Sequence, residues 1–415
     1  MPTILAMHAL ISLLRQFLLP PIQLRRSIFM LATATVLALP AGAQTEFQQC
    51  LSGLRSPAKA AGVKEDSFAR FTQGLSPDMG ILDKMNNQPE FRMPIWDYLA
   101  ALVDDERVAE GQAQLAKHRE LLDKVATQYG VDPATVVAVW GVESNFGQTF
   151  GKYPLTQALG TLSCFGNRQT YFRGEFYATL RILQAGHIAP ERLVGSWAGA
   201  FGHTQFMPTT FERLAQDFDG DGRRDLMDSV PDALASTAHF LSKAGWNPAQ
   251  VWGFEVKLPA GTDVSGEGRK TKRALSEWAA RGLTRVDGSA LPLNGGPVGL
   301  MTPAGNKGPA FLVFRNFDAI YSYNAAESYG LAIAHLSDRL RGGRPFITPW
   351  PTDDAGLSRA ERREIQTLLS ARGHDIGEID GMLGDKSRIA IKAEQTRLGH
   401  EVNGRAGQKL LRALR

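Results

Sequence analysis

The chain has 415 residues, a length that accommodates two or three domains. Its apolar content of 43% and charged content of 21% are those of soluble globular proteins. The net charge of +4 is small, and no basic run with interleaved aromatic residues indicates a nucleic-acid partner. Two cysteines, Cys50 and Cys164, are too few for a Cys-rich zinc site.

Residues 1–43 are predicted to be a signal segment. Arg25-Arg26 precedes the apolar run Ser27–Leu39, and the small residues Ala41-Gly42-Ala43 suit cleavage after Ala43. The run is too short to span a membrane comfortably as a permanent helix. An uncleaved anchor, or an upstream extension over residues 1–25, is the alternative. In an exported protein, the even pair of cysteines predicts a disulfide between Cys50 and Cys164.

Residues 46–130 are predicted to be helical, because their apolar residues recur at helical spacing. The next helix has clear local boundaries. Asp132 is expected to be its N-cap, with Pro133 at the first helical position, where a proline costs no hydrogen bond. Gly147 is expected to end it.

Glu143 is the one acidic residue of this helix, and it shares a face with Trp140 and Val136. A carboxyl group on an apolar face loses hydration, which raises its pKa and keeps it protonated near neutral pH. A glutamate in that state suits general acid catalysis. The alternative is a structural ion pair with an arginine such as Arg168 or Arg173.

A buried helix is predicted over Tyr171–Leu183, whereas the preceding stretch, Tyr153–Gly166, is rich in small and turn residues. The segment Ser196–Pro208 contains glycines that allow close approach of the backbone. Gln205 is therefore expected in a tight turn, where its amide either binds a polar ligand or stabilises its own turn. Thr209–Glu212 follows with the spacing of a capping box.

The stretch Asp217–Asp228 is close to an EF-hand loop. Acidic residues fill positions 1, 3, 5, 9 and 12, and Gly222 stands at position 6. Position 12 is the shorter Asp228 where a bidentate glutamate is usual, and position 8 is Arg224 instead of an apolar residue. The alternative to a Ca²⁺ site is a solvated acidic turn. The predicted ligands are Asp217, Asp219, Asp221, the carbonyl of Arg223, and Asp228 or Asp232.

Strand character is found in Phe254–Pro259 and Val298–Phe314, and a helix is predicted over Gly330–Leu340. Between them, Tyr323, Asn324 and Tyr329 offer aromatic faces and an amide that could line a sugar cleft. The alternative is the polar start of a helix, packed by tyrosines.

Residues 342–355 are rich in proline and glycine and are predicted to be a linker. Residues 356–415 then form three short predicted helices. They contain no candidate catalyst, so a binding module is expected there.

These motifs together resemble the membrane-bound lytic transglycosylase B family, over about residues 46–340. The resemblance rests on Gly141–Gly147, Ser196–Gly202 running into Gln205–Pro208, Asp217–Asp228, and Tyr323-Asn324 with Tyr329. Residues 357–411 resemble a peptidoglycan-binding domain, with Ser387 and Glu394 in place of the usual threonine and aromatic residue. The residues that carry this second resemblance are Gln366, Leu369, Gly373, Asp380, Gly381 and Gly384.

The resemblance implies an α+β, mainly helical fold: a lysozyme-like core over residues 44–341, with a small β-containing insertion, and a C-terminal three-helix peptidoglycan-binding domain. It implies cleavage of the β-1,4 bond between N-acetylmuramic acid and N-acetylglucosamine without water, which leaves 1,6-anhydro-muramyl ends. Glu143 would be the sole acid and base. Calcium would be structural, and no organic cofactor is expected. Sugar-binding positions would be Ser196, Gln205, Tyr323, Asn324 and Tyr329.

Two alternatives remain open at this point. One is a muramidase that hydrolyses the same bond, and the other is a non-catalytic cell-wall binding protein. In each case we expect a periplasmic monomer that binds peptidoglycan glycan strands and no nucleic acid. Cell-wall synthesis or division proteins are candidate partners.

Overall fold

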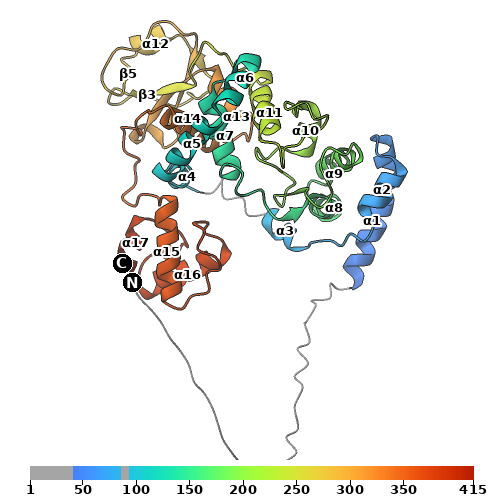
Figure 1. The fold of residues 1–415 in the computed structure, drawn as a ribbon. Coiled ribbons are helices and arrows are strands. Elements are labelled where there is room, and N and C mark those ends of the chain that lie inside the picture. Colours follow the sequence, from blue (N-terminus) through green and yellow to red (C-terminus); the bar gives the residue numbers. More distant parts are fainter. Residues whose placement is uncertain (1–40, 86–92) are drawn as a thin grey trace, which may run out of the picture. The chain divides into compact units, whose positions relative to one another are not determined.

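The computed structural model describes residues 41–85 and 93–415, so most of the predicted signal segment lies outside the described residues. The described chain is mainly helical, as predicted (Figure 1). No helix within it is long and apolar enough to cross a membrane. The first helices are α1 (Ala41–Ala60), α2 (Glu65–Thr72), α3 (Gly80–Met85), α4 (Ile95–Leu102), α5 (Asp105–Lys117), α6 (Arg119–Tyr129) and α7 (Pro133–Ser144). They are followed by α8 (Leu155–Phe165), α9 (Gln169–Gln184), α10 (Pro208–Leu214), α11 (Val230–Lys243), α12 (Leu275–Ala280), α13 (Arg315–Tyr321) and α14 (Glu327–Leu340).

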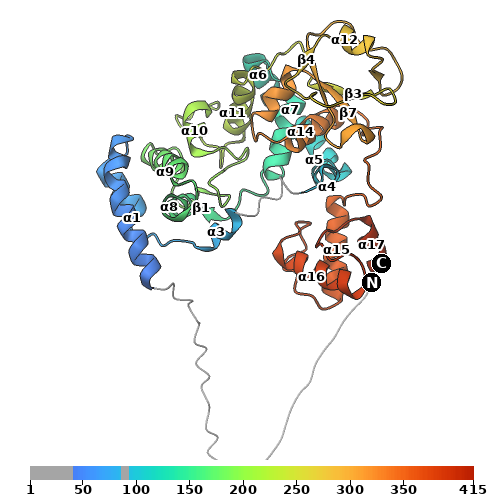
Figure 2. The same ribbon diagram turned by 180° about the vertical axis from the view of Figure 1, so that it is seen from behind.

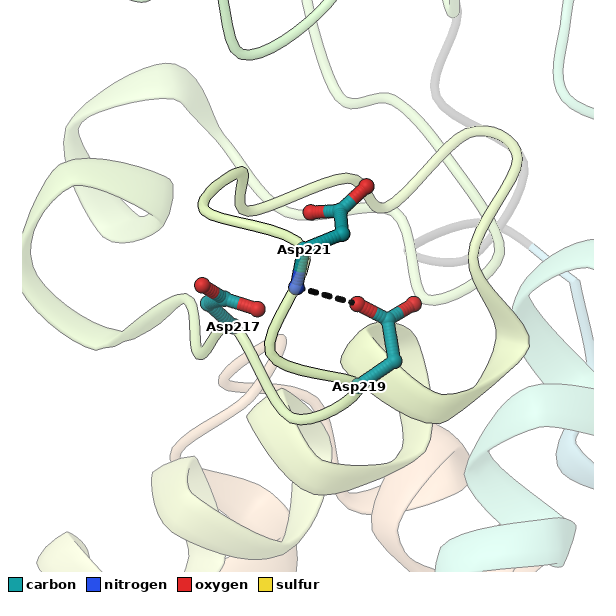
Figure 3. Close-up of side chains that lie close together, drawn as sticks. All are labelled: Asp217, Asp219 and Asp221. Atoms are coloured by element: carbon teal, nitrogen blue, oxygen red, sulfur yellow. Dashed lines mark hydrogen bonds between the residues drawn. The ribbon is translucent and has the colours of Figure 1, made fainter.

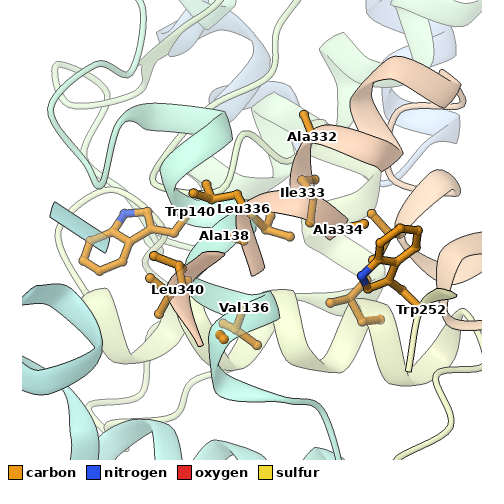
Figure 4. Close-up of a cluster of buried hydrophobic side chains, with 14 of the residues drawn as sticks. Val136, Ala138, Trp140, Trp252, Ala332, Ile333, Ala334, Leu336 and Leu340 are labelled. Atoms are coloured by element: carbon orange, nitrogen blue, oxygen red, sulfur yellow. The ribbon is translucent and has the colours of Figure 1, made fainter. Parts of the chain in front are cut away.

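Helix α7 lies at the centre of the largest apolar core. Asp132 caps its first turn by accepting a hydrogen bond from Thr135 N, and Pro133 is its first residue, as the sequence predicts. Figure 4 shows Val136, Ala138 and Trp140 of α7 among side chains of α14. The expectation that Gly147 ends the helix is wrong, because α7 ends at Ser144.

A left-handed turn directly follows α7. Asn145 and Phe146 have φ angles of 49° and 57°, and Gly147 continues the turn with φ 84°. Asn145 tolerates this conformation better than most residues, whereas Phe146 adopts it at a cost. The C-cap of the helix, Asn145, therefore lies one residue before the position that a glycine at C′ predicts, and packing holds two non-glycine residues in the left-handed region.

A second core joins α1 to α8, α9 and α10 (Figure 2). Cys50 of α1 and Cys164 of α8 form a disulfide with their Cα atoms 5.9 Å apart. Helix α8 occupies the stretch that is rich in small and turn residues, and its Gly160 packs beside Phe47 and Phe176. Small residues serve here for close helix packing.

A five-stranded antiparallel sheet forms the β-containing insertion, in the order β4-β6-β7-β3-β5. Its central strands are buried on both faces. In β7, Leu312 faces one apolar cluster with Trp278, whereas its neighbours Phe311 and Val313 join the core around α7. The strands are β3 (Gly253–Lys257), β4 (Lys272–Arg273), β5 (Thr284–Arg285), β6 (Val298–Met301) and β7 (Ala310–Val313), and a separate pair is β1 (Tyr153–Pro154) with β2 (Val194–Gly195).

The C-terminal helices α15 (Arg359–Ala371), α16 (Asp385–Arg397) and α17 (Gln408–Leu414) share a separate small core. Glu394 is buried in this part of the chain and pairs with His374 and Arg397. Glu394, which stands where an aromatic residue is usual, is therefore the centre of a small ion-pair cluster.

The segment that precedes these helices is anchored to the sheet and to α14. The Glu255 carboxylate of β3 accepts hydrogen bonds from Ile347 N and Thr348 N, at 2.8 and 2.7 Å. Phe346 stacks on His335 with ring centroids 3.8 Å apart. The predicted linker is therefore held at several points, and residues Gly42–Arg415 form one compact unit.

Candidate active site

Glu143 lies in the last turn of α7, half-buried, with the hydroxyl of Tyr329 donating a hydrogen bond to its Oε1. Burial raises the pKa of Glu143 from its ordinary 4.5 to about 8, and the hydrogen bond from Tyr329 opposes this rise. The carboxyl group is thus mainly protonated at neutral pH. No other carboxylate among the described residues shifts this pKa.

Among the described residues, Glu143 forms no ion pair with an arginine, and both arginines named in that alternative have other partners. The Arg168 guanidinium lies over the ring of Tyr171, with Cζ 4.3 Å from the ring centroid. Arg173 donates to Ser163 O and to Gln169 Oε1. Burial and one hydroxyl therefore define the environment of this carboxyl group.

His203 contacts the end of α7 and was not predicted from the sequence. Its Nδ1 accepts a hydrogen bond from Trp140 Nε1 at 3.0 Å, and its carbonyl oxygen accepts one from Ser144 Oγ at 2.6 Å. Burial lowers the pKa of His203 to about 4, so its imidazole is neutral. A Cβ atom at Gly147 would lie 2.5 Å from this ring, which explains the glycine at that position.

Tyr323 and Tyr329 stand side by side, with ring centroids 6.2 Å apart. The hydroxyl of Tyr323 donates to Thr204 O at 2.6 Å, and that of Tyr329 donates to Glu143. The predicted tyrosines thus connect the start of α14 to the loop that carries Gln205 and to the candidate acid.

Ser196 and Gln205 are occupied with their own turns. Ser196 Oγ accepts from Ala200 N at 3.1 Å, and Gln205 Nε2 donates to Gly202 O and Phe150 O, at 2.9 and 3.3 Å. The amide nitrogen of Gln205 therefore stabilises its own turn, which is the alternative to ligand binding that the sequence left open. Asn324, by contrast, has an exposed side chain just before α14.

The predicted capping box after this loop is wrong. Helix α10 begins at Pro208, with Met207 as its N-cap, two residues before the predicted cap. Thr209 donates from its N and Oγ1 to the buried carboxylate of Glu175. Glu212 instead forms a salt bridge with Arg181 of α9. Thr209 and Glu212 are thus paired with Glu175 and Arg181 of α9, and not with each other's backbone as in a capping box.

A cavity of about 760 Å³ lies beside the segment that joins Tyr323 to Tyr329. Its walls combine apolar side chains with the half-buried carboxyl group of Glu327. The lining residues near the start of α14 are Ala325, Ala326, Glu327 and Ser328. Met93 and Pro94, just before α4, and Trp96, in its first turn, line another part.

The acidic loop gathers three of its predicted ligands (Figure 3). Asp217, Asp219 and Asp221 are exposed, and each offers a carboxylate oxygen within 4.8 Å of the others. Asp228 instead pairs with Arg192, and the buried Asp232 accepts hydrogen bonds from three backbone amides of the loop. Hard carboxylate oxygens so arranged fit a Ca²⁺ ion.

A helical core that presents one protonated carboxylic acid, hydrogen-bonded by a tyrosine, suits an enzyme that uses general acid catalysis. The chain belongs to the family described as the transglycosylase SLT domain, whose model matches residues 46–338. Residues 358–414 match the model of a putative peptidoglycan-binding domain. The resemblance inferred from the motifs is thereby confirmed.

Individual relatives agree with this assignment. The chain is 33% identical to the membrane-bound lytic murein transglycosylase B of Escherichia coli over an alignment of 255 residues, which covers 58% of this chain and 65% of that protein. SltB3 of Pseudomonas aeruginosa, solved with NAG-NAM-pentapeptide, is 44% identical with a TM-score of 0.72, over 89% of this chain and 99% of that one. The E. coli transglycosylase Slt35 with calcium is 28% identical with a TM-score of 0.61, over 72% of this chain and 93% of that one.

Proposed function

We propose that this chain is a lytic transglycosylase that cleaves the β-1,4 bond between N-acetylmuramic acid and N-acetylglucosamine. The observation that carries the proposal is the environment of Glu143, which burial keeps protonated and Tyr329 holds in place. Both usual glycosidase geometries need a second carboxylate. A reaction in which the substrate supplies its own nucleophile needs only one.

The cleavage begins with proton transfer from Glu143 to the glycosidic oxygen, which breaks the bond to the anomeric carbon. The acetamido oxygen of the muramic residue bonds transiently to that carbon. The C6 hydroxyl of the same sugar then displaces the acetamido group and closes the 1,6-anhydro ring. Its proton passes to the Glu143 carboxylate, so the acid is regenerated. Tyr329 stabilises the intervening carboxylate through its hydrogen bond.

We assign the sugar-facing side chains around this acid to the start of α14 and the loop before α10. The exposed amide of Asn324 is the better candidate for contact with the acetamido group, because Gln205 already donates its amide N–H groups to two carbonyl oxygens. Ser196 and Gln205 would shape the wall of the cleft, and Tyr323 would provide its floor. The cavity lined by residues 325–328 lies next to these side chains in the sequence and would extend the surface for the glycan strand, although Glu143 itself does not line it.

The acidic loop is proposed to hold one structural Ca²⁺ ion through Asp217, Asp219 and Asp221, with the Arg223 carbonyl as a further ligand. Slt35, a solved relative, was crystallised with calcium. Asp228 and Asp232 are already engaged by Arg192 and by backbone amides. The Ca²⁺ ligands would therefore be the carboxylates of Asp217, Asp219 and Asp221, together with backbone oxygen atoms.

We further propose that the enzyme is exported to the periplasm, and that residues 44–341, 342–355 and 356–415 are its catalytic domain, linker and peptidoglycan-binding domain. The composition of residues 1–43 and the Cys50–Cys164 disulfide support export. The peptidoglycan-binding match supports retention at the cell wall.

The products of digested peptidoglycan test the reaction. Mass spectrometry should find 1,6-anhydro-muramyl ends, which are lighter by one water than hydrolysis products. Reducing muramyl ends would establish the muramidase instead. Glu143→Gln is nearly isosteric and should bind insoluble peptidoglycan while losing cleavage by several orders of magnitude. Equal cleavage by that variant would rule out both enzymatic alternatives at this site.

A further inference from the structure

The first residue of the peptidoglycan-binding domain's first helix reaches the turn that carries the catalytic motif. Arg359 Nη1 donates a hydrogen bond to Asn145 Oδ1 at 2.6 Å, two residues after Glu143. The same guanidinium pairs with Glu106 and Glu110 of α5, at 3.2 and 2.9 Å. The Arg359 side chain is only 9% exposed, whereas Glu106 and Glu110 remain partly exposed, at 40% and 32%.

Asp104 joins the same two helices through their backbones. Its Oδ1 accepts from Arg107 N at 2.8 Å and caps α5, while its Oδ2 accepts from Arg359 N at 2.9 Å at the start of α15. Arg107 in turn donates from Nη1 to the carbonyl oxygen of Gly141, two residues before Glu143. Both sides of the candidate acid are therefore linked to the point where α15 meets α5.

The turn formed by Asn145 and Phe146 needs such support, chiefly at Phe146, because asparagine tolerates the left-handed region better than most residues. Asn145 and Phe146 are consecutive non-glycine residues in the left-handed region, with φ angles of 49° and 57°. This conformation persists only where surrounding contacts hold it. Phe146 packs edge-on against Trp140, and the side chain of Asn145 is held between Arg359 and Gln148.

We propose that Arg359 is a positioning residue for the reaction: through Asn145 it holds the end of α7, and with it Glu143, in the geometry that cleavage requires. The binding domain then contributes to the chemical step and not only to local concentration at the cell wall. The planar guanidinium suits this task, because it donates in several directions to Asn145, Glu106 and Glu110 at once. The inference rests on the proposed role of Glu143.

The test compares two arginines of the C-terminal domain, each of which pairs with residues of the preceding domain. Arg405 also belongs to the C-terminal domain and pairs with Asp97 of α4, but it makes no contact with the catalytic motif. On soluble glycan fragments, Arg359→Met in the full chain should lower kcat by about ten- to a hundred-fold, the usual effect of a misplaced catalytic group. Its KM should stay within about two-fold. Arg405→Gln should leave both values near those of the wild type.

A second measurement does not depend on activity. The amides of Gly147, Gln148 and Thr149 bond back to Ser144, so hydrogen exchange over this turn reports its order. Exchange should be faster in Arg359→Met than in Arg405→Gln. Asn145→Gly removes the acceptor but keeps the left-handed backbone accessible, and should reproduce the kcat loss without disturbing the acidic residues of α5.

Equal kcat and equal exchange in Arg359→Met and Arg405→Gln would overturn the proposal and leave the binding domain as an anchor. Non-additivity of Arg359→Met with Asn145→Gly would support it, whereas full additivity would contradict it. If the wild type cleaves nothing, the proposed function fails. The exchange comparison then still decides whether Arg359 orders the turn.

Discussion

The hydroxyl of Tyr329 donates a hydrogen bond to Oε1 of Glu143, although the two residues are 186 positions apart in the chain. Tyr329 is buried, with 2% of its surface exposed, so packing holds its ring, and with it the hydroxyl oxygen, beside the carboxyl group. Burial raises the pKa of Glu143, whereas this hydrogen bond lowers it. Tyr329 therefore tunes the acid on which the proposed reaction depends.

Tyr329→Phe removes that donor with little change in packing. The hydrogen bond lowers the pKa of Glu143, so its loss should raise that pKa further. The alkaline limb of the kcat profile should move to higher pH, and kcat should fall about ten-fold. A pH series on soluble glycan fragments measures both effects. An unchanged alkaline limb would show that Tyr329 does not act on the acid.

Glu143→Gln should stabilise the protein, increasingly as the pH rises. The pKa of Glu143 is raised from 4.5 to about 8, so the native state holds a proton that the unfolded chain releases between those values. The contribution of Glu143 to stability is thus greatest at low pH and declines as the pH approaches 8. We expect an advantage of at least about 1 kcal/mol for the glutamine variant at pH 8 over pH 5. Denaturant unfolding at both pH values measures it, and a pH-independent difference would contradict the raised pKa.

Calcium should raise the melting temperature of the wild type, since an ion that binds only the native state stabilises it by mass action. Asp219→Asn keeps an acceptor for Asp221 N but removes one charge of the trio, and should abolish the gain. Asp263→Ala is the matched control, because Asp263 lies in another exposed turn and caps Ser265. Identical melting curves of the wild type with calcium and with a chelator would rule out the site.

Cys164→Ser should destabilise the exported protein. The disulfide to Cys50 closes a loop over a sequence separation of 114 residues. A loop of that length contributes about 4 kcal/mol in the chain-entropy model. Thermal unfolding of the variant, and alkylation of the denatured but unreduced wild type, check the prediction. Two free thiols in the wild type would contradict it.

Features that depend on neighbours in the chain could be predicted from the sequence. Asp132 and Pro133 define the start of α7 because a cap and its first turn are made within a few residues. The spacing of Asp217, Asp219 and Asp221 brings their carboxylates together within one loop for the same reason. The family motifs also indicated the class of enzyme correctly.

Other features were decided only by tertiary packing. The end of α7 moved to Ser144, Thr209 bonded to Glu175 instead of forming a capping box, and small residues formed the buried helix α8. In each case a contact with a distant segment outweighs a weak local preference, because a buried polar or apolar group gains more from a partner than a turn gains from its ideal residue. The contacts of Glu143 with Tyr329, and of Asn145 with Arg359, have no local signature at all. They exist because the fold brings together residues that are 186 and 214 positions apart.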